Sequence, residues 1–242
     1  MKSSIGILIA NDIKNITRDA ILIMSILAPI LFASAIRFVV PIIGELLREQ
    51  YGFNLLEHYT FIIGFMIVLT PLMIGTLIGF LILDERDEDI ITFYSVTPLL
   101  KSGYIYYRTF IPAVFNLVFT IILVYYTGVL EVSFLTLVPV VLMASLAVPM
   151  MALFLGAFAG NKVEGLALSK GVGIMFFGPV IGYLVGSWWN ILAGILPPYW
   201  VSMAFLSQVD KVGVAYLFYI VVGIGIHTFI IGLLYKKFKI RI

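Results

Sequence analysis

The sequence has no cysteine and few charges, and each shortage removes a class of function. Without cysteine, the 242-residue chain can form no disulfide and can offer no thiolate as a nucleophile or a metal ligand. Charged residues make up 12% of the chain and hydrophobic residues 62%. The formal net charge of +2 argues against a nucleic-acid partner. A mean hydropathy of +1.13 is too high for a soluble domain, so we expect an integral membrane protein.

The motifs of common catalytic sites are missing as well. His58 and His227 have no partners at metal-ligand spacing, and the chain contains neither His-Glu-x-x-His nor Gly-x-Ser-x-Gly. The fragment GNKVEGLA, which starts at Gly160, has the glycine spacing of a Walker A loop. Leu166 and Ala167 stand where that loop needs Lys and Ser/Thr. We therefore expect no cofactor or metal in this chain, and we expect any ATP to be bound by another chain.

What the sequence has in excess is long apolar runs. A hydrocarbon core of about 30 Å needs about 20 apolar residues of helix, and six segments reach that length. The expected fold class is an all-α membrane protein, with six transmembrane helices in a single transmembrane domain, 1–242. The six segments are Ala20–Gly44, Tyr59–Leu83, Tyr104–Leu130, Ser133–Ala159, Gly165–Trp188 and Val212–Tyr235.

Lysine and arginine are distributed unevenly over the ends of these spans. With both termini inside, only Arg37, Arg48 and Lys211 of the fifteen basic residues lie on the outer side. Cytoplasmic loops retain positive charge, so we expect a multi-pass protein with both termini in the cytoplasm. The C-terminal sequence KKFKIR is the strongest anchor on that side, and it can also contact anionic membrane lipid.

Two segments outside the spans have patterns of their own. Residues 1–18 carry apolar residues at helical spacing, which predicts an amphipathic interfacial helix, with an irregular tail as the alternative. Residues 187–211 are too apolar for a solvated loop and too interrupted by glycine and proline to span, so we expect outer re-entrant or interfacial helices. The aromatic residues of this segment are typical of the headgroup belt: Trp188, Trp189, Tyr199 and Trp200.

Small residues recur every four positions in span five, a spacing that lets helix backbones approach closely. We expect packing within one chain, with a dimer face as the alternative. The residues concerned are Gly178, Gly182 and Gly186.

Few ionisable residues lie inside the spans. Arg37 is the main exception, and we expect it to reach outward or to pair with Glu45 or Glu49. His227 is the other, and a hydrogen-bonded place in the helix bundle is its simplest role. Because proton- and sodium-coupled carriers usually keep ionisable groups near the midplane, this scarcity argues against such a carrier.

The densest charge in the chain follows span two. All six residues from Asp84 to Asp89 are charged, and five of them are acidic. Acids are favoured at a helix N-terminus, and Pro98 disfavours further helix. We therefore predict a short surface helix over about Glu85–Val96, with Asp84 as its cap. Its apolar stripe needs cover from lipid or from another protein, and comprises Ile90, Phe93, Tyr94 and Thr97.

This loop resembles that of the integral-membrane permeases of type-2 ABC exporters. Their pattern begins with Glu-Arg and an acid or Lys, and ends with Thr/Ser-Pro-Leu/Val before a basic residue in the next span. Here residues 85–99 read ERDEDIITFYSVTPL, and Arg108 follows in span three. Asp89-Ile90 stands where that family has Gly-Thr. The half-size chain, the amphipathic first helix, the six spans and the broken segment before span six are similar too.

The resemblance implies a mechanism and partners. In that family the loop, here 84–97, is a coupling helix that docks on a separate cytoplasmic ATP-binding subunit, which carries ATP and Mg²⁺. Two permease chains, identical or paralogous, pair in the prokaryotic plasma membrane and export a substrate. The permease itself is not an enzyme. The contacts with the ATPase subunit that the resemblance implies are Glu85, Arg86, Glu88, Phe93, Tyr94 and Pro98.

Two other functions stay open at this point. A self-sufficient secondary transporter or channel would move its substrate without ATP, and an intramembrane enzyme or a scaffold would need no ATPase partner. The apolar spans favour a small hydrophobic or amphipathic substrate, such as a drug, a lipid or a peptide. Recovery of an ATP-binding subunit with the chain from detergent extracts would decide between these hypotheses.

Overall fold

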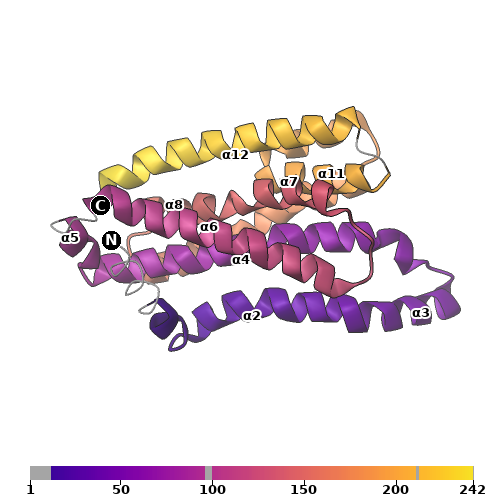
Figure 1. Ribbon diagram of the computed structural model, residues 1–242, viewed down its shortest axis with the longest axis horizontal. Helices are drawn as coiled ribbons and strands as arrows, with labels where there is room; N and C mark the ends of the chain where they lie inside the picture. The colour runs from indigo at the N-terminus through magenta and orange to yellow at the C-terminus, as the bar shows by residue number, and fades with distance from the viewer. Residues whose placement is uncertain (1–11, 96–99, 211–212, 242) are drawn as a thin grey trace.

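The computed structural model describes residues 12–95, 100–210 and 213–241. Within these ranges the chain is an elongated bundle of helices without a strand (Figure 1). Six helical segments are long and apolar enough to cross a membrane, which confirms the expected all-α membrane fold. They are Ala20–Tyr51, Leu55–Asp87, Leu100–Thr127, Phe134–Phe158, Lys162–Leu184 and Val214–Arg241.

The first segment is one long helix with a local irregularity. Asp19 caps α2 (Ala20–Ser34), because its carboxylate accepts the backbone N–H of Ile21 at 2.8 Å. A π-helical turn, Ala35–Val39, then leads into α3 (Val40–Tyr51). Arg37 in this turn donates to the backbone carbonyl of Tyr126. Among the described residues Arg37 forms no ion pair with Glu45 or Glu49, so that alternative is wrong, and its side chain is exposed.

The centre of the bundle is α4 (Tyr59–Asp87), which follows a short 3₁₀ turn, Leu55–His58. It packs closely on α8 (Ala147–Phe158), because Gly75 and Gly79 face that helix without a side chain. A Cβ on Gly75 would lie 2.7 Å from the Cβ of Met151 and 2.8 Å from the carbonyl oxygen of Val148. The glycine spacing therefore brings two spans of one chain together.

The fourth span is interrupted in its middle. It consists of α7 (Phe134–Ser145) and α8, which are separated at Leu146. Pro149 explains the break, because proline has no N–H to donate and its ring clashes with the carbonyl four residues earlier, at Ser145. The third and sixth spans, α6 (Leu100–Thr127) and α12 (Val214–Arg241), are long single helices that pack on α8 from two sides.

The fifth span is composite: α9 (Lys162–Gly171), a 3₁₀ turn Val172–Phe176, and α10 (Phe177–Leu184). Its glycines face the same chain at two of the three singled-out positions. A Cβ on Gly182 would lie 2.9 Å from the sulfur of Met203, and Gly178 faces the backbone of Tyr199. Nothing lies within 4 Å of a Cβ on Gly186. Packing within one chain thus accounts for Gly178 and Gly182.

The segment before span six is part of the core. After a 3₁₀ turn, Trp188–Ile195, helix α11 (Pro197–Asp210) packs against α4, α10 and α12. Tyr199 and Trp200 are buried, so their expected place in the headgroup belt is wrong. The indole N–H of Trp200 donates to the carbonyl of Gly194 at 2.7 Å, which satisfies its polar atom inside the bundle. Trp188 is exposed, and so is Trp189.

Six passes bring the first and last described residues to the same end of the bundle, which we call the terminal end (Figure 1). Helix α5 (Ile90–Ser95) lies at the tip of this end. Residues 12–16 are helical there, while most of the predicted interfacial helix 1–18 lies outside the described residues.

Candidate functional site

The loop between α4 and α6 differs from the single surface helix predicted for it. Helix α4 continues through Asp87. The helical path is interrupted at Asp89, whose backbone is left-handed with a φ of 57°. Helix α5 then begins at Ile90. The prediction that a helix starts at Glu85 with Asp84 as its cap is therefore wrong. The physical reason is that Glu85 and Arg86 find partners inside the bundle, and these contacts hold the last turn of α4 in place.

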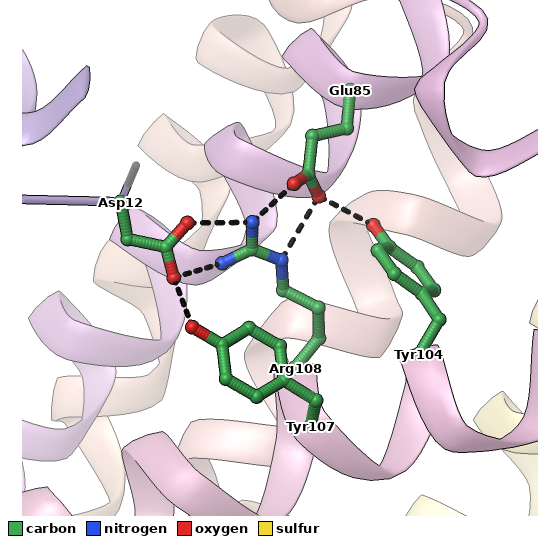
Figure 2. A network of polar contacts seen from close by, with 5 residues as sticks. All are labelled: Asp12, Glu85, Tyr104, Tyr107 and Arg108. Atoms are coloured by element: carbon green, nitrogen blue, oxygen red, sulfur yellow. Dashed lines mark hydrogen bonds and ion pairs between the residues drawn. The ribbon is translucent and has the colours of Figure 1, made fainter. Parts of the chain in front are cut away.

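Glu85 is the centre of a buried polar cluster (Figure 2). Its carboxylate accepts the hydroxyl of Tyr104 at 2.7 Å and the Nε–H of Arg108 at 2.9 Å. A second hydrogen bond comes from Nη2 of Arg108. The carboxylate of Glu85, at the end of α4, is thus bonded to two side chains in the first turns of α6.

Asp12 completes the cluster from the other side of Arg108. Its two carboxylate oxygens accept Nη1 and Nη2 of Arg108, each at 2.8 Å. The hydroxyl of Tyr107 donates to the same carboxylate at 2.6 Å. Arg108 therefore holds two carboxylates in bidentate geometry, one from α4 and one from the helical turn at residues 12–16 (Figure 2).

The charges of the cluster are buried and balance one another. The side chain of Arg108 is 2% exposed and that of Glu85 is 5% exposed, so neither charge is solvated by water. One cation faces two carboxylates, and the hydroxyls of Tyr104 and Tyr107 stabilise the remaining negative charge. Losing either Arg108 or Glu85 would leave a buried charge without its closest opposite charge, which is costly. The cluster thus fastens together the residues on either side of the loop 88–99.

Basic residues cap a neighbouring helix at the same end. Arg86 donates to the carbonyls of Gly156 at 3.0 Å and Ala159 at 2.6 Å, and Arg241 donates to the carbonyl of Ala157 at 2.7 Å. These carbonyls belong to the last turn of α8, which lacks intrahelical partners and carries the negative end of the macrodipole. Arg86 therefore links α4 to α8.

A second ion-pair group joins three helix ends. The ammonium of Lys162, at the start of α9, lies 2.7 Å from a carboxylate oxygen of Asp19 and 2.7 Å from one of Asp84. The hydrogen bond from Lys162 holds the pKa of the Asp19 carboxyl below its ordinary value, against the opposing effect of burial. Asp84 thus binds α4 to α2 and α9, rather than capping a surface helix.

The remaining predicted contacts fall into two groups. Glu88 is exposed, together with Asp87 and Asp89, so three acids face outward just before α5. Ile91 is 3% exposed and packs into the apolar core of the terminal end, which anchors α5 on the bundle. Phe93 and Tyr94 belong to α5, but their side chains lie outside the described part of the structure, as does all of Pro98.

A cavity of about 650 Å³ opens between α6 and α12, and its floor is formed by α7 and α8. Its lining is mostly apolar and includes Ile105, Phe110 and Leu153. Tyr106 and Tyr235 lie in its lining on opposite walls, and Ser145 lies at the interruption of the fourth span. The volume falls within the range of about 300–1,000 Å³ that is usual for small-molecule sites.

Sequence reasoning selected Glu85 and Arg86 but assigned them to an external contact, and it missed Asp12, Tyr107 and Lys162 as partners. Glu85 and Arg108 are 73 and 96 positions from Asp12 in the chain, so no local pattern connects these three residues. One signal was available. Arg108 lies inside a predicted apolar span, where a charge requires a partner.

Comparison with known proteins gives the family. The model of a family described as "Fluoroquinolones export permease protein Rv2686c-like" matches residues 12–235, nearly the whole chain. This chain belongs to that family of export permeases. Two relatives in Mycobacterium tuberculosis are the fluoroquinolones export permease proteins MT2760, of strain CDC 1551, and Rv2686c, of strain H37Rv. Each is 31% identical over 234 residues, which is 96% of this permease and 92% of the relative.

No solved structure is a significant match to this export permease. The family match and the six spans confirm the resemblance to the membrane permeases of type-2 ABC exporters. The chain is thus a multi-pass membrane permease that serves export, which fits its expected lack of enzymatic activity of its own.

Proposed function

We propose that this permease works with a separate cytoplasmic ATP-binding subunit, which docks on residues 87–95 and drives export by hydrolysing ATP with Mg²⁺. The proposal rests on three structural features of this segment. Its acids are exposed, and α5 is anchored through the buried Ile91. The two ends of the loop are fastened together by Glu85 and Arg108.

The exposed acids suit a basic docking surface. Asp87, Glu88 and Asp89 are consecutive and exposed at the terminal end of the bundle. Complementary charge speeds the encounter of two proteins and fixes their register. Because α5 rests on the core and α4 and α6 are bonded through Arg108, a displacement of α5 would move both spans together. The exposed acids would thus bind the ATP-binding subunit, and the buried cluster would pass the displacement of α5 on to α4 and α6.

We also propose an orientation in the membrane and a pairing of permease chains. Four exposed basic residues lie in the last turns of α12 at the terminal end, which the positive-inside rule places in the cytoplasm of a prokaryotic cell. A second permease chain, identical or paralogous, would pair with this one in the plasma membrane. The basic residues are Lys236, Lys237, Lys239 and Arg241.

The substrate that we propose is a small hydrophobic or amphipathic molecule of the fluoroquinolone type. Two observations support this. The relatives in Mycobacterium tuberculosis are named for fluoroquinolone export. The cavity between α6 and α12 has an apolar lining and hydroxyl groups from Tyr106 and Tyr235, and its volume of about 650 Å³ suits a molecule of drug size.

Co-purification tests the docking proposal. The permease is expressed together with the ATP-binding subunit that we expect a neighbouring gene to encode, and the complex is isolated from detergent extracts. Glu88→Lys should reduce the recovered ATPase subunit by about tenfold, because it places a cation in the proposed acidic surface. The double variant Phe93→Ala, Tyr94→Ala should do the same by removing apolar anchors. Export is measured in parallel as fluoroquinolone resistance of the cells.

Glu131→Lys is the matched control, because Glu131 is also an exposed acid but lies in the loop between α6 and α7, at the opposite end. It should leave co-purification unchanged. Normal recovery of the ATPase subunit with Glu88→Lys and with the double variant would contradict the docking proposal. Resistance that persists after deletion of the ATPase gene would instead favour a self-sufficient secondary transporter.

A further inference from the structure

An arginine lies inside the first membrane-spanning segment, far from the terminal end. Arg37 follows Asp19 by 18 residues, which is about 27 Å of helix. Its partner Tyr126 follows Arg108 by 18 residues along the neighbouring α6. The second helix therefore gives the same distance between the contact and the charged groups of the terminal end. Asp19 and Arg108 both belong to the charged groups of the terminal end. The contact therefore lies near the far boundary of a hydrocarbon core of about 30 Å.

The local backbone turns Arg37 towards α6. The π-helical turn Ala35–Val39 interrupts the regular helix, and such turns are rare and recur at functional sites. Nη1 of Arg37 donates to the carbonyl of Tyr126 at 2.7 Å. This carbonyl is in the last turn of α6, where the macrodipole is negative. The guanidinium carbon lies 5.0 Å from the ring centre of Tyr126 and 5.5 Å from that of Phe38.

Most of the binding capacity of this guanidinium is unused. An arginine side chain has five N–H donors, and the structure shows one of them in a hydrogen bond. Arg37 is exposed, and no carboxylate among the residues that the structure describes forms an ion pair with it. Arg108 is the contrast, with two carboxylates around it. A cation at the membrane boundary can extend into the headgroup region, where oxyanions are within its reach.

We propose that Arg37, Phe38 and Tyr126 form a binding site for the oxyanion of an amphipathic molecule in the leaflet opposite to the chain termini. A carboxylate or a phosphate accepts two parallel N–H bonds from a guanidinium. The flanking rings offer apolar faces to the rest of the molecule. The Tyr126 ring next to the cation also carries a hydroxyl, which lies 3.4 Å from that of Ser34.

Two sources can supply this oxyanion. One is the carboxylate of an exported aromatic acid, and this source rests on the proposed function. The other is the phosphate of a phospholipid in the same leaflet. The experiment separates them and needs no ATP-binding subunit, so its outcome is independent of the docking proposal.

The test uses the purified permease in nanodiscs of zwitterionic phosphatidylcholine. Binding of naphthoate and of its uncharged methyl ester is measured by equilibrium dialysis, after subtraction of protein-free nanodiscs. The wild type should bind the acid more tightly than the ester. Arg37→Gln should weaken binding of the acid by about tenfold, and it should leave the ester unaffected. Arg48→Gln, which removes another exposed arginine of the same span, should bind both as the wild type does.

A second arm uses nanodiscs that contain a minority of phosphatidylglycerol. If phospholipid phosphate is the ligand, native mass spectrometry should find this lipid retained by the wild type and lost from Arg37→Gln. Arg37→Lys keeps the charge without the planar fork, so it should give an intermediate result even if the glutamine variant folds poorly. Acid binding and lipid retention equal to the wild type in both Arg37 variants would overturn the proposal.

Discussion

Arg108 shows how the cost of a buried charge governs single residues in this protein. Four of its N–H donors are in hydrogen bonds with Asp12 and Glu85, and its side chain is 2% exposed. Replacement of the cation would leave the Glu85 carboxylate in the bundle without its ion-pair partner, while the hydrogen bond from the Tyr104 hydroxyl would remain. A stable protein would therefore need to reorganise the whole cluster.

We predict that Arg108→Met lowers the free energy of unfolding by about 3–5 kcal/mol, since it breaks a buried ion pair from one side. Tyr107→Phe removes one hydrogen bond to a carboxylate and should cost only about 1.5–3 kcal/mol. Thermal unfolding of the detergent-purified variants measures both effects. Equal shifts for the two variants would show that the charge of Arg108 is solvated rather than buried.

Asp19 provides a prediction about pH. Its folded pKa lies below the ordinary value of 3.8, with the Lys162 hydrogen bond as the main cause. The stabilisation is complete above the unfolded pKa, and it is lost as the pH falls through the folded pKa, in a window below about pH 4. The melting temperature of Lys162→Met should therefore fall below that of the wild type at neutral pH. The difference should shrink in acid, and a constant difference from pH 7 to pH 3 would contradict this account.

At the scale of helices, the close contact of α4 with α8 depends on the absence of a side chain at Gly75. A Cβ there would approach the backbone carbonyl of Val148, which cannot move without shifting α8. We predict that Gly75→Ala destabilises the bundle by about 1–3 kcal/mol. Gly232→Ala on α12 is the control, because nothing lies within 4 Å of its Cβ. The control should be neutral or slightly stabilising in thermal unfolding, since alanine favours helix.

The loop between α4 and α6 shows what local patterns can and cannot predict. The acids after span two and the apolar residues behind them predicted one short helix over about Glu85–Val96, whereas the structure has α4 run through Asp87 and a separate short helix at Ile90–Ser95. Its start was placed five residues too early, because the capping rule treats Asp84 and Glu85 as free acids. Their partners Lys162 and Arg108 are distant in sequence. The role of the segment in docking on an ATPase stays a prediction.

For the whole molecule, the length of the apolar runs was sufficient to predict six spans, since crossing a bilayer requires that length. The same reasoning could not place α11. Its sequence is broken by prolines and rich in aromatic residues, which is also typical of an interfacial helix. The burial of Tyr199 and Trp200 depends on contacts with α10 and α12 that form only in the folded bundle.

The topology predicts which side each end of the bundle faces. The chain has no cysteine, so single cysteines can be introduced without background. Lys239→Cys is exposed at the terminal end, and Glu131→Cys is exposed at the opposite end. In intact cells, a membrane-impermeant maleimide should label Glu131→Cys alone, and Lys239→Cys should react only after permeabilisation. The reverse pattern would invert the proposed orientation.

The length of the central helices has a consequence for the membrane itself. Helix α4 has 29 residues, and α6 and α12 have 28 each. At 1.5 Å per residue these helices are roughly 42–44 Å long, against a hydrocarbon layer of about 30 Å. The bundle must tilt or extend into the headgroups, and the balance depends on the acyl chains around it. Bilayer thickness would thereby set the angle at which α4 presents its charged end to the water.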